Sequence, residues 1–338
     1  MAGDEDVTGL LAAAPPRERR ASLLFAAVHY LLLKAADHPL ARFYPALAGA
    51  PPDRDPTPVF VAFCRERRAD LIAIIGTRRV QPNEVQRSAA LLPALALAAE
   101  RFEEPMALVD LGCGAGLNLL FDRFRYGYGR LASVGPEESP VRLSCAIRGS
   151  NPPPIPESMP RAVHRIGIDE NPLDATDPDD ALWLRACIWP ERTEADAQVA
   201  GAIDLARASP PELIAGHALD ALPRILAGQP GDAPVCVLTS ATLAYLDVNE
   251  RTELAEALRR LAEHRRLAWV TLEGSRYSPV TCSDRAPAAA GCLGLTDFDR
   301  GRGEALALAS MHGNWLEWIM GRSGEARGGA LLPAHRLE

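Results

Sequence analysis

The chain has 338 residues, of which 48% are hydrophobic, and a formal net charge of −8. This size and composition suit one large folded domain, or a domain with an appendage. The acidic balance argues against a broad nonspecific nucleic-acid surface, which would normally make the chain basic, so we expect no nucleic-acid partner. A local arginine-lined cleft is still compatible with this composition.

Two residue types narrow the class of protein further. Lys34 is the only lysine among the 36 Lys and Arg residues and lies in an apolar stretch, which argues against a phosphate-loop NTPase and against Schiff-base chemistry. The seven cysteines are scattered without a C-x-x-C pair, so we expect neither a disulfide framework nor a metal site. The N-terminus, M-A-G-D-E-D, is acidic, and no apolar run reaches the ~20 residues that span a bilayer. We therefore expect a cytoplasmic protein with no membrane partner.

The first part of the chain contains helical patterns only. An apolar run over residues 21–34 predicts a buried helix, and helical runs follow near 59–76 and 83–101. Beyond them the pattern changes to short strand-like runs that are separated by helices. We therefore predict three parts: an all-helical N-terminal cap over residues 1–100, an α/β domain over 101–322, and a flexible tail over 323–338.

A polar trio opens the last of these helical runs. Asn83 or Glu84 shares a helical face with Arg87, because the spacing is i, i+3 or i+4. In a structural interpretation, which the sequence alone favours, Asn83 caps the helix and Glu84 interacts with its dipole. In a functional interpretation the trio forms a wall of the binding site, and Arg87 anchors a substrate carboxylate or phosphate. We treat all three as candidate substrate-binding residues.

Residues 107–118, A-L-V-D-L-G-C-G-A-G-L-N, are the most informative stretch of the chain. An apolar run typical of a buried parallel strand is followed by three glycines at alternate positions and then by an apolar helical pattern. Glycine lets the backbone turn sharply and approach a ligand closely, and a helix that starts there directs unpaired N–H groups at the turn. We therefore expect a small, partly anionic ligand at this turn. The alternative is an ordinary tight connection.

The spacing within this turn favours S-adenosylmethionine over a dinucleotide. A dinucleotide fingerprint has Gly or Ala where this chain has Leu117, and an acid about 20 residues further on. The region at that distance does not look like a strand that ends in an acid. Asp110, two residues before the first glycine, is instead the pattern of S-adenosylmethionine enzymes, and its carboxylate can lie near the ammonium group of that cofactor. The cofactor contacts expected here are Asp110, Gly112, Gly114, Gly116, Leu117 and Asn118.

Beyond the turn, strands alternate with helices. We expect strands near 106–111, 141–147, 163–168, 212–216, 234–240 and 267–273, and helices near 116–125, 178–188, 193–208 and 249–264. This alternation predicts an α/β fold with a doubly wound, mostly parallel sheet. Two further runs within residues 292–316, joined by R-G-R-G, predict an antiparallel hairpin that closes the sheet.

Further candidates follow the later strands or lie in the loops. Thr239, Ser240 and Thr242 come at the carboxyl end of an apolar strand, where open α/β sheets bind ligands, and we expect Thr239 to contact the cofactor. Methyltransferases that act on amino groups of DNA, RNA or glutamine have the tetrapeptide N-P-P-Y or D-P-P-Y at this point of the chain. Neither tetrapeptide occurs here, so these substrates are disfavoured. His312 lies after the last strand and is a candidate substrate contact. Tyr126 belongs either to a substrate lid or to a packed loop.

Several longer motifs occur in the order found in a bacterial family, the domain-of-unknown-function family 2332. They are L-L-F-A-A-V-H-Y-L-L-L, H-P-L-A-R-F-Y-P, T-R-R-V-Q-P-N-E-V-Q-R, G-A-G-L-N-L-L-F-D-R-F-R-Y-G-Y-G, G-I-D-E-N-P-L-D, W-L-R-A-C-I-W-P-E and H-G-N-W-L-E-W. The chain resembles this family over roughly residues 21–320. Members of the family are similar to class I S-adenosylmethionine-dependent methyltransferases with an N-terminal helical extension. The resemblance implies a Rossmann-like methyltransferase sheet, and it favours the functional interpretation of the polar trio.

The resemblance also implies two further cofactor contacts. The second strand of a class I enzyme usually ends in an acid that accepts hydrogen bonds from the ribose hydroxyls, and Asp169 ends the matching strand here. The alternative is that Asp169 only caps a turn. Where the family tends to have Gly-Asp after the third strand, this chain has Gly216-His217, so His217 takes the place expected to face the adenine. Pro82 and Gln86 also depart from the family pattern.

These observations together predict an S-adenosylmethionine-dependent methyltransferase that acts on a small molecule. We assign no general base, because in-line methyl transfer can run largely on proximity and orientation. Two alternatives stay open. The first is a catalytically silent S-adenosylmethionine-binding or interaction module on the same fold. The second is an NAD-linked oxidoreductase, which depends on the glycines alone and is disfavoured by Leu117.

Overall fold

The structure is a computed structural model, and it describes residues 5–228, 232–282, 287 and 289–320. The chain divides into two compact units, and each unit is built from two separate segments. The first unit consists of Met1–Asn83 and Leu173–Ile203, and the second consists of Glu84–Pro172 and Asp204–Glu338. The chain therefore leaves the second unit once and returns to it.

The described part of the first unit is helical. α2 (Ala21–Lys34) is apolar on nearly all sides and packs against α5 (Arg68–Thr77) and α7 (Pro178–Ala186). The side chain of Asp177 caps α7 by accepting hydrogen bonds from the first N–H groups of that helix. The other helices are α1 (Glu5–Thr8), η1 (Gly9–Ala13), η2 (Pro16–Glu18), η3 (Pro39–Phe43), α3 (Pro45–Ala48), α4 (Thr57–Glu66) and the N-terminal part of α8 (Thr193–Ala208).

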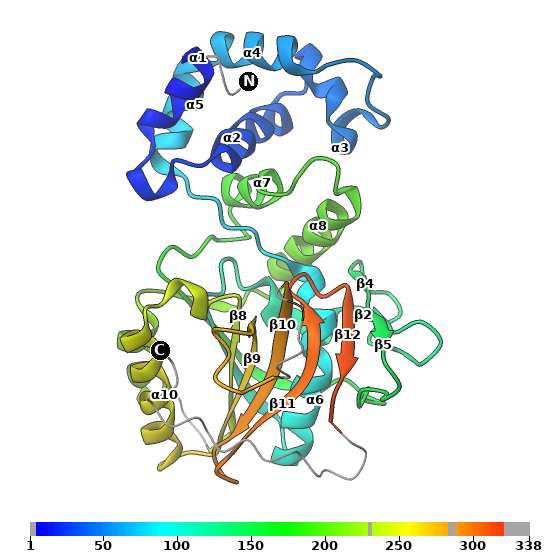
Figure 1. The fold of residues 1–338 in the computed structure, drawn as a ribbon, viewed down its shortest axis with the longest axis vertical. Coiled ribbons are helices and arrows are strands. Elements are labelled where there is room, and N and C mark those ends of the chain that lie inside the picture. Colours follow the sequence, from blue (N-terminus) through cyan, green and yellow to red (C-terminus); the bar gives the residue numbers. More distant parts are fainter. Residues whose placement is uncertain (1–4, 229–231, 283–286, 288, 321–338) are drawn as a thin grey trace. The chain divides into compact units, whose positions relative to one another are not determined.

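The second unit is built around a nine-stranded sheet (Figure 1). In chain order its strands are β1 (Met106–Leu111), β5 (Ala146–Arg148), β6 (Ala162–Asp169), β7 (Glu212–Ala215), β8 (Val235–Ser240), β9 (Leu267–Gly274), β10 (Ala290–Asp297), β11 (Arg302–Ser310) and β12 (Trp315–Trp318). A separate small sheet has the order β3-β2-β4 and consists of β2 (Arg125–Gly127), β3 (Ser133–Val134) and β4 (Arg142–Ser144). The helices are η4 (Val85–Arg87), α6 (Ser88–Phe102), η5 (Leu117–Arg123), α9 (Ala218–Gly228), η6 (Leu243–Tyr245) and α10 (Val248–Ala262).

The strand order places β1 in the middle of the parallel part of the sheet. The large sheet runs β5-β12-β11-β10-β9-β8-β1-β6-β7. Strands β7, β6, β1, β8 and β9 run parallel to one another. β10 is antiparallel to β9 and to β11, and β12 is antiparallel to β11 and parallel to β5. The structure therefore confirms an α/β fold with a mostly parallel sheet and an antiparallel β10–β11 hairpin.

Helices cover this sheet and bury its central strands. Every residue of β1 and β8 is buried, as expected for parallel strands that are covered on both faces. Val109 and Trp269 face one side, where they pack with Leu222 of α9 and Leu258 of α10. Alternate residues such as Leu108 point to the opposite face. α6 packs against β9, β10 and β11, and Figure 1 shows it behind β10 and β11.

The bounds of the two units differ from the predicted ones. The sequence pattern divides the chain near residue 100, but α6 packs with the sheet of the second unit. Conversely, α7 and the first part of α8 belong to the first unit although they follow several strands in the chain. A helical pattern shows that a segment has an apolar face, but not which of two cores this face joins. The tail predicted over residues 323–338 lies outside the described residues.

Most predicted elements agree with the structure to within two residues, including β1, β6 to β9, α7, α8 and α10. The helix predicted near residues 116–125 is present as the 3-10 helix η5 and not as an α-helix. Gly116 enters η5 with a φ of 68°, and Leu120 has non-helical dihedral angles. Leu117 to Phe121 are all buried, so packing rather than α-helical hydrogen bonding determines the conformation of this segment.

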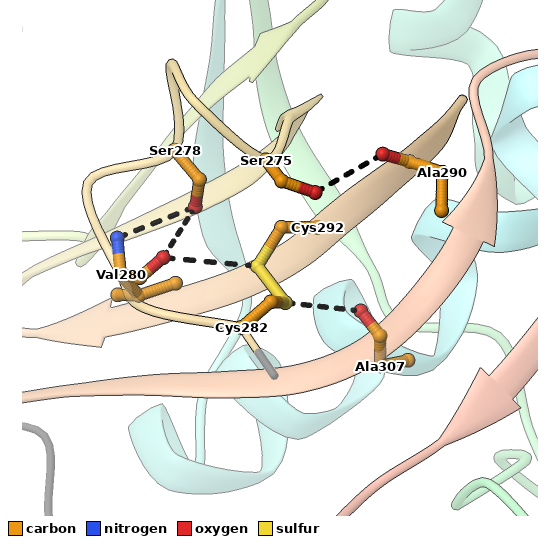
Figure 2. Close-up of a disulfide and its surroundings, with 7 residues drawn as sticks. All are labelled: Ser275, Ser278, Val280, Cys282, Ala290, Cys292 and Ala307. Carbon is orange, nitrogen blue, oxygen red and sulfur yellow. Dashed lines mark hydrogen bonds between the residues drawn. A yellow bond between two sulfur atoms is a disulfide. The ribbon is translucent and has the colours of Figure 1, made fainter. Parts of the chain in front are cut away.

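A disulfide joins Cys282 to Cys292 (Figure 2). This pair corrects the expectation from the scattered cysteines, which predicted no disulfide. Cys292 lies on β10 and Cys282 lies in the connection from β9, so the antiparallel return of the chain brings them together across a separation of 10 residues. The hydroxyl of Ser278 fixes the same connection by bonding to the N–H and the carbonyl of Val280. The free thiols are Cys64, Cys113, Cys145, Cys187 and Cys236.

Replacing both Cys282 and Cys292 by alanine is expected to lower the free energy of unfolding by about 2–3 kcal/mol, because a crosslink over ten residues removes that much entropy from the unfolded chain. Thermal unfolding should show a lower midpoint for the variant, and a reductant should lower the midpoint of the wild type only. A thiol assay in denaturant should find five thiols before reduction and seven after it. Seven thiols without reduction would contradict the crosslink.

Candidate functional site

The carboxyl ends of the parallel strands are the first place to examine for a ligand site. In chain order the parallel strands are β1, β6, β7, β8 and β9, and in the sheet they lie as β7-β6-β1-β8-β9. The chain therefore moves from β1 to one side, then crosses to β8 on the other side. Open α/β sheets bind ligands outside the carboxyl ends of the strands at such a switch point.

The turn after β1 has the backbone conformation that the glycine pattern predicts. Gly112, Gly114 and Gly116 have φ values of 75°, 60° and 68°, which glycine adopts without steric penalty. A Cβ on Gly112 would lie 2.6 Å from Oγ1 of Thr242, and a Cβ on Gly116 would lie 2.8 Å from Cδ2 of Leu213. These two glycines therefore make room for side chains of the protein itself.

Backbone N–H groups of this turn have partners inside the chain. The N–H groups of Gly112 and Cys113 donate to the carbonyl of Ile168, at 2.8 and 3.3 Å. The N–H group of Gly114 donates to Oδ2 of Asp169 at 2.9 Å. The expectation that N–H groups of the turn point at a ligand is therefore not met at these three positions. Any ligand at this edge has to be recognised chiefly by side chains.

Two buried carboxylates lie close to the switch point. Asp110 on β1 is 3% exposed and Glu273 on β9 is fully buried. Burial raises the pKa of each carboxyl group to about 7, although the positive charge of Arg87 opposes the shift. Oε1 of Glu273 accepts a hydrogen bond from the N–H of Thr242 at 3.1 Å. Oε2 makes no hydrogen bond with the residues that the structure describes, although the Thr239 hydroxyl lies close enough to lower this pKa.

Arg87 is the cation that faces both carboxylates. Through Nη1 its guanidinium donates to the carbonyl and to Oγ of Ser240, at 3.0 and 3.1 Å. Through Nε it donates to the carbonyl of Met311 at 3.0 Å. Burial lowers the pKa of Arg87, and the surrounding acids, led by Glu84, oppose that shift. These hydrogen bonds go to neutral oxygens and not to the carboxylates. Arg87 therefore offsets the negative charge of the buried acids by electrostatic attraction without a direct hydrogen bond to either.

Glu84 and His312 meet at the same edge of the sheet. Oε2 of Glu84 lies 2.9 Å from Nδ1 of His312, across 228 positions of sequence. Arg87 binds the carbonyl of Met311, the residue before His312. The structure therefore brings together three of the predicted substrate-binding residues. Asn83, the first of the polar trio, ends the first compact unit, so the trio is divided between the two units.

Asp169 supports the glycine turn from the neighbouring strand. It ends β6, and its Oδ2 and Oδ1 accept hydrogen bonds from the N–H groups of Gly114 and Asn171, both at 2.9 Å. These contacts are the ones expected of a turn cap. A carboxylate oxygen can accept a second hydrogen bond, so the ribose contact stays a prediction.

Two of the predicted cofactor residues lie within the core. Leu117 is fully buried. Asn118 is 5% exposed, and its Oδ1 accepts a hydrogen bond from the hydroxyl of Ser88 at 2.9 Å. Asn118 therefore connects the start of η5 to the start of α6, and Leu117 contributes to packing below the turn.

Thr239 and His217 also have partners within the second unit. Thr239 is fully buried, and its hydroxyl oxygen accepts a hydrogen bond from the indole N–H of Trp269 at 3.2 Å. His217 stands just before α9, and its Nε2 lies 3.5 Å from Oε1 of Glu250 on α10. The Thr239 side chain is therefore buried and bonds to the neighbouring strand β9. His217 is directed toward α10, and its adenine contact stays a prediction.

Tyr126 and Tyr128 are core residues. They are 1% and 2% exposed. The hydroxyl of Tyr126 donates to the carbonyl of Phe121 at 2.6 Å, and that of Tyr128 donates to the carbonyl of Ala89 at 2.8 Å. The packed-loop interpretation therefore describes these tyrosines, and Tyr126 is not placed to contact a substrate.

Glu273 and Tyr245 also lie at this edge, although they are not among the residues predicted from the sequence. Like Asp110, Glu273 is an acidic residue near the end of an apolar strand, and this position is the sequence signal by which it could have been found. Tyr245 on η6 is 81% exposed and close enough to Arg87 to raise the pKa of the guanidinium. An exposed tyrosine in a loop has no distinguishing sequence pattern.

Two kinds of feature are not found in the described part of the chain. No group of three or more His, Cys, Asp or Glu residues there is arranged to hold a metal ion. Nor does any described helix have both the length and the apolar composition needed to cross a membrane.

The comparisons with known proteins give one match. The model of a family described as "Uncharacterized protein conserved in bacteria (DUF2332)" matches residues 1–318. No curated protein and no solved structure matches the chain. The match spans segments of both compact units, so the helical unit is as much a part of the family pattern as the sheet.

Proposed function

The chain belongs to the DUF2332 family, and from the geometry of its second unit we propose that it is an S-adenosylmethionine-dependent methyltransferase acting on a small molecule. The observation that carries the proposal is the excess of buried acid at the switch point, where Asp110 and Glu273 face one cation, Arg87. Buried charges of one sign need a counter-charge. S-adenosylmethionine carries an ammonium and a sulfonium group, and it supplies an activated methyl group when bound.

The chain's own residues divide between the two ends of such a site. Asp110 accompanies the glycine turn and faces the cationic part of the cofactor. Asp169, on the next strand, takes the ribose hydroxyls. Glu84, Arg87 and His312 form the substrate side, because they lie together where the β11–β12 turn meets the start of α6.

The two alternatives make different demands on this edge. A dinucleotide has a pyrophosphate, which needs open N–H groups, whereas three N–H groups of the glycine turn are already bonded. This observation disfavours an NAD-linked oxidoreductase. A catalytically silent module would bind S-adenosylmethionine through the same acids without converting it to S-adenosylhomocysteine.

The affinity for S-adenosylmethionine is expected to rise by about tenfold per carboxylate between pH 6 and pH 8. Asp110 and Glu273 have pKa values of about 7, and a cation binds to their ionised forms. Calorimetric titration measures this change, and buffers with different heats of ionisation count the protons released.

S-Adenosylhomocysteine is the matched control, because it lacks the sulfonium charge and should show a weaker pH dependence. NAD tests the dinucleotide alternative in the same titration. Absence of binding by both adenosyl compounds at millimolar concentration would refute the proposal. Mass spectrometry of any molecule that copurifies with the protein gives an independent identification.

A further inference from the structure

The β11–β12 turn presents an exposed histidine with an unusual partner. The side chain of His312 is 62% exposed, whereas that of Glu84 is 9% exposed, and Nδ1 lies 2.9 Å from Oε2 of the carboxylate. An exposed histidine on a turn normally rotates freely in solvent. Here a largely buried acid holds one of the two ring nitrogens.

The backbone around His312 is fixed as well. The carbonyl of Met311 accepts a hydrogen bond from Arg87 at 3.0 Å, and the carbonyl of Gly313 accepts one from the side chain of Gln86 at 3.2 Å. Gly313 has a φ of +82°, and a Cβ there would lie 2.3 Å from the carbonyl oxygen of Gln86. The turn is therefore pressed onto the backbone of residues 86–87, and only glycine permits this approach.

We propose that His312 is the proton-accepting residue of this site and that Glu84 positions it. Glu84 accepts the Nδ1–H of the imidazole, which fixes the tautomer in which Nε2 is unprotonated and basic. The inference rests on the proposed function. In that reaction a bond forms between the methyl carbon and the acceptor's oxygen or nitrogen while the bond from that carbon to sulfur breaks, so that sulfur keeps the electron pair and S-adenosylhomocysteine leaves. The acceptor loses its proton to Nε2, and the imidazolium then releases that proton to solvent. The substrate class is thus a small molecule that reacts through a hydroxyl or an N–H group.

The tautomer of His312 is the first test. Nitrogen NMR of the imidazole side chains should place the proton on Nδ1 of His312 in the wild type. Glu84→Leu removes the acceptor and should move that proton to Nε2. An Nε2–H tautomer in the wild type, or no change in Glu84→Leu, would overturn the proposal.

Acylation by diethyl pyrocarbonate is the second test, because this reagent attacks an unprotonated ring nitrogen. His264 is an exposed histidine just after α10 and serves as the internal reference. We expect His312 to react at least threefold faster than His264 in the wild type, and at the rate of His264 in Glu84→Leu. Equal rates in the wild type would show that Glu84 does not hold Nε2 in its unprotonated, reactive form.

A pair of glycine variants tests the positioning of the turn without altering Glu84. Gly313 and Gly301 both have positive φ, but a Cβ on Gly301 would meet nothing within 4 Å. Gly313→Ala should therefore lose the fast acylation of His312, whereas Gly301→Ala should keep it. Equal acylation in the two variants would argue against a fixed turn.

Titration of the wild type with S-adenosylmethionine separates this inference from the proposed function. If the wild type binds no S-adenosylmethionine but passes the NMR and acylation tests, the proposed function fails and the Glu84–His312 pair stands. If the wild type binds the cofactor but fails those tests, the pair is structural only.

Discussion

Replacing Arg87 by methionine is expected to lower the free energy of opening the second unit by about 3–5 kcal/mol at pH 8, the usual effect of removing one partner from buried charges. The guanidinium faces Asp110 and Glu273 and also donates to the carbonyls of Ser240 and Met311. Methionine keeps the apolar part of the side chain and removes the charge and the donors. At pH 5 both carboxylates are largely protonated, so only the loss of hydrogen bonds, about 1 kcal/mol each, should remain.

Hydrogen exchange of the β1 and β8 peptides at increasing urea measures this free energy without assuming that both units unfold together. Arg260→Met is the matched control, because Arg260 is an exposed arginine on α10 that lies 3.8 Å from Glu256. It should change the free energy by no more than about 0.5 kcal/mol. Arg87→Lys keeps the charge without the planar fork and should fall between the two. Equal losses at pH 5 and pH 8 in Arg87→Met would rule out compensation of the acids by Arg87.

The elements that the sequence predicts well are those with a strong local pattern. β1 and β8 are buried on both faces, so they are continuous apolar runs, and they are bounded by turn-forming residues. α10 begins with a capping box in which Asp247 and Glu250 bond to each other's backbone N–H groups. Such signals lie within a few positions of the element that they define.

The elements that the sequence predicts poorly depend on short or interrupted patterns. α9 has Pro223 in its interior, and β2, β3 and β4 are at most three residues long. A strand of this length does not show a recognisable alternation. After the glycine turn the apolar run is helical, as its pattern predicts, but it forms the buried 3-10 helix η5 and not an α-helix.

The residues of the candidate site also differ in how well a local sequence pattern identifies them. Asp110 is marked by its place before the glycines, and Glu84 with Arg87 by their helical spacing. The contact of Glu84 with His312 depends on the strand order, which places the β11–β12 turn against the start of α6 across 228 positions. Residue types thus identify most members of the site, and the tertiary fold decides which of them meet.

Replacing Asp110 by asparagine is expected to stabilise the ligand-free protein at pH 8 by on the order of 4 kcal/mol. Burial raises the pKa of this carboxyl group from 3.8 to about 7, so the folded state binds more protons than the unfolded state between these values. The free energy of unfolding is therefore highest below pH 4, falls as the pH rises to about 7, and is level above that. Asparagine has no charge to bury, so the variant should lack this part of the decline and should match the wild type only at low pH.

Hydrogen exchange of the β1 peptides between pH 4 and pH 8, corrected for intrinsic exchange, measures the decline. Asp220→Asn, which alters an exposed carboxylate on α9, is the control and should follow the wild-type curve. A decline of the same size in Asp110→Asn would contradict the buried charge. The same variant should bind S-adenosylmethionine at least tenfold more weakly at pH 8, because it lacks the anion that a cationic ligand would neutralise. If Asp110→Asn is more stable but binds S-adenosylmethionine more weakly, the charge of Asp110 serves binding and destabilises the fold. If the variant loses both stability and binding, Asp110 is an ordinary structural residue.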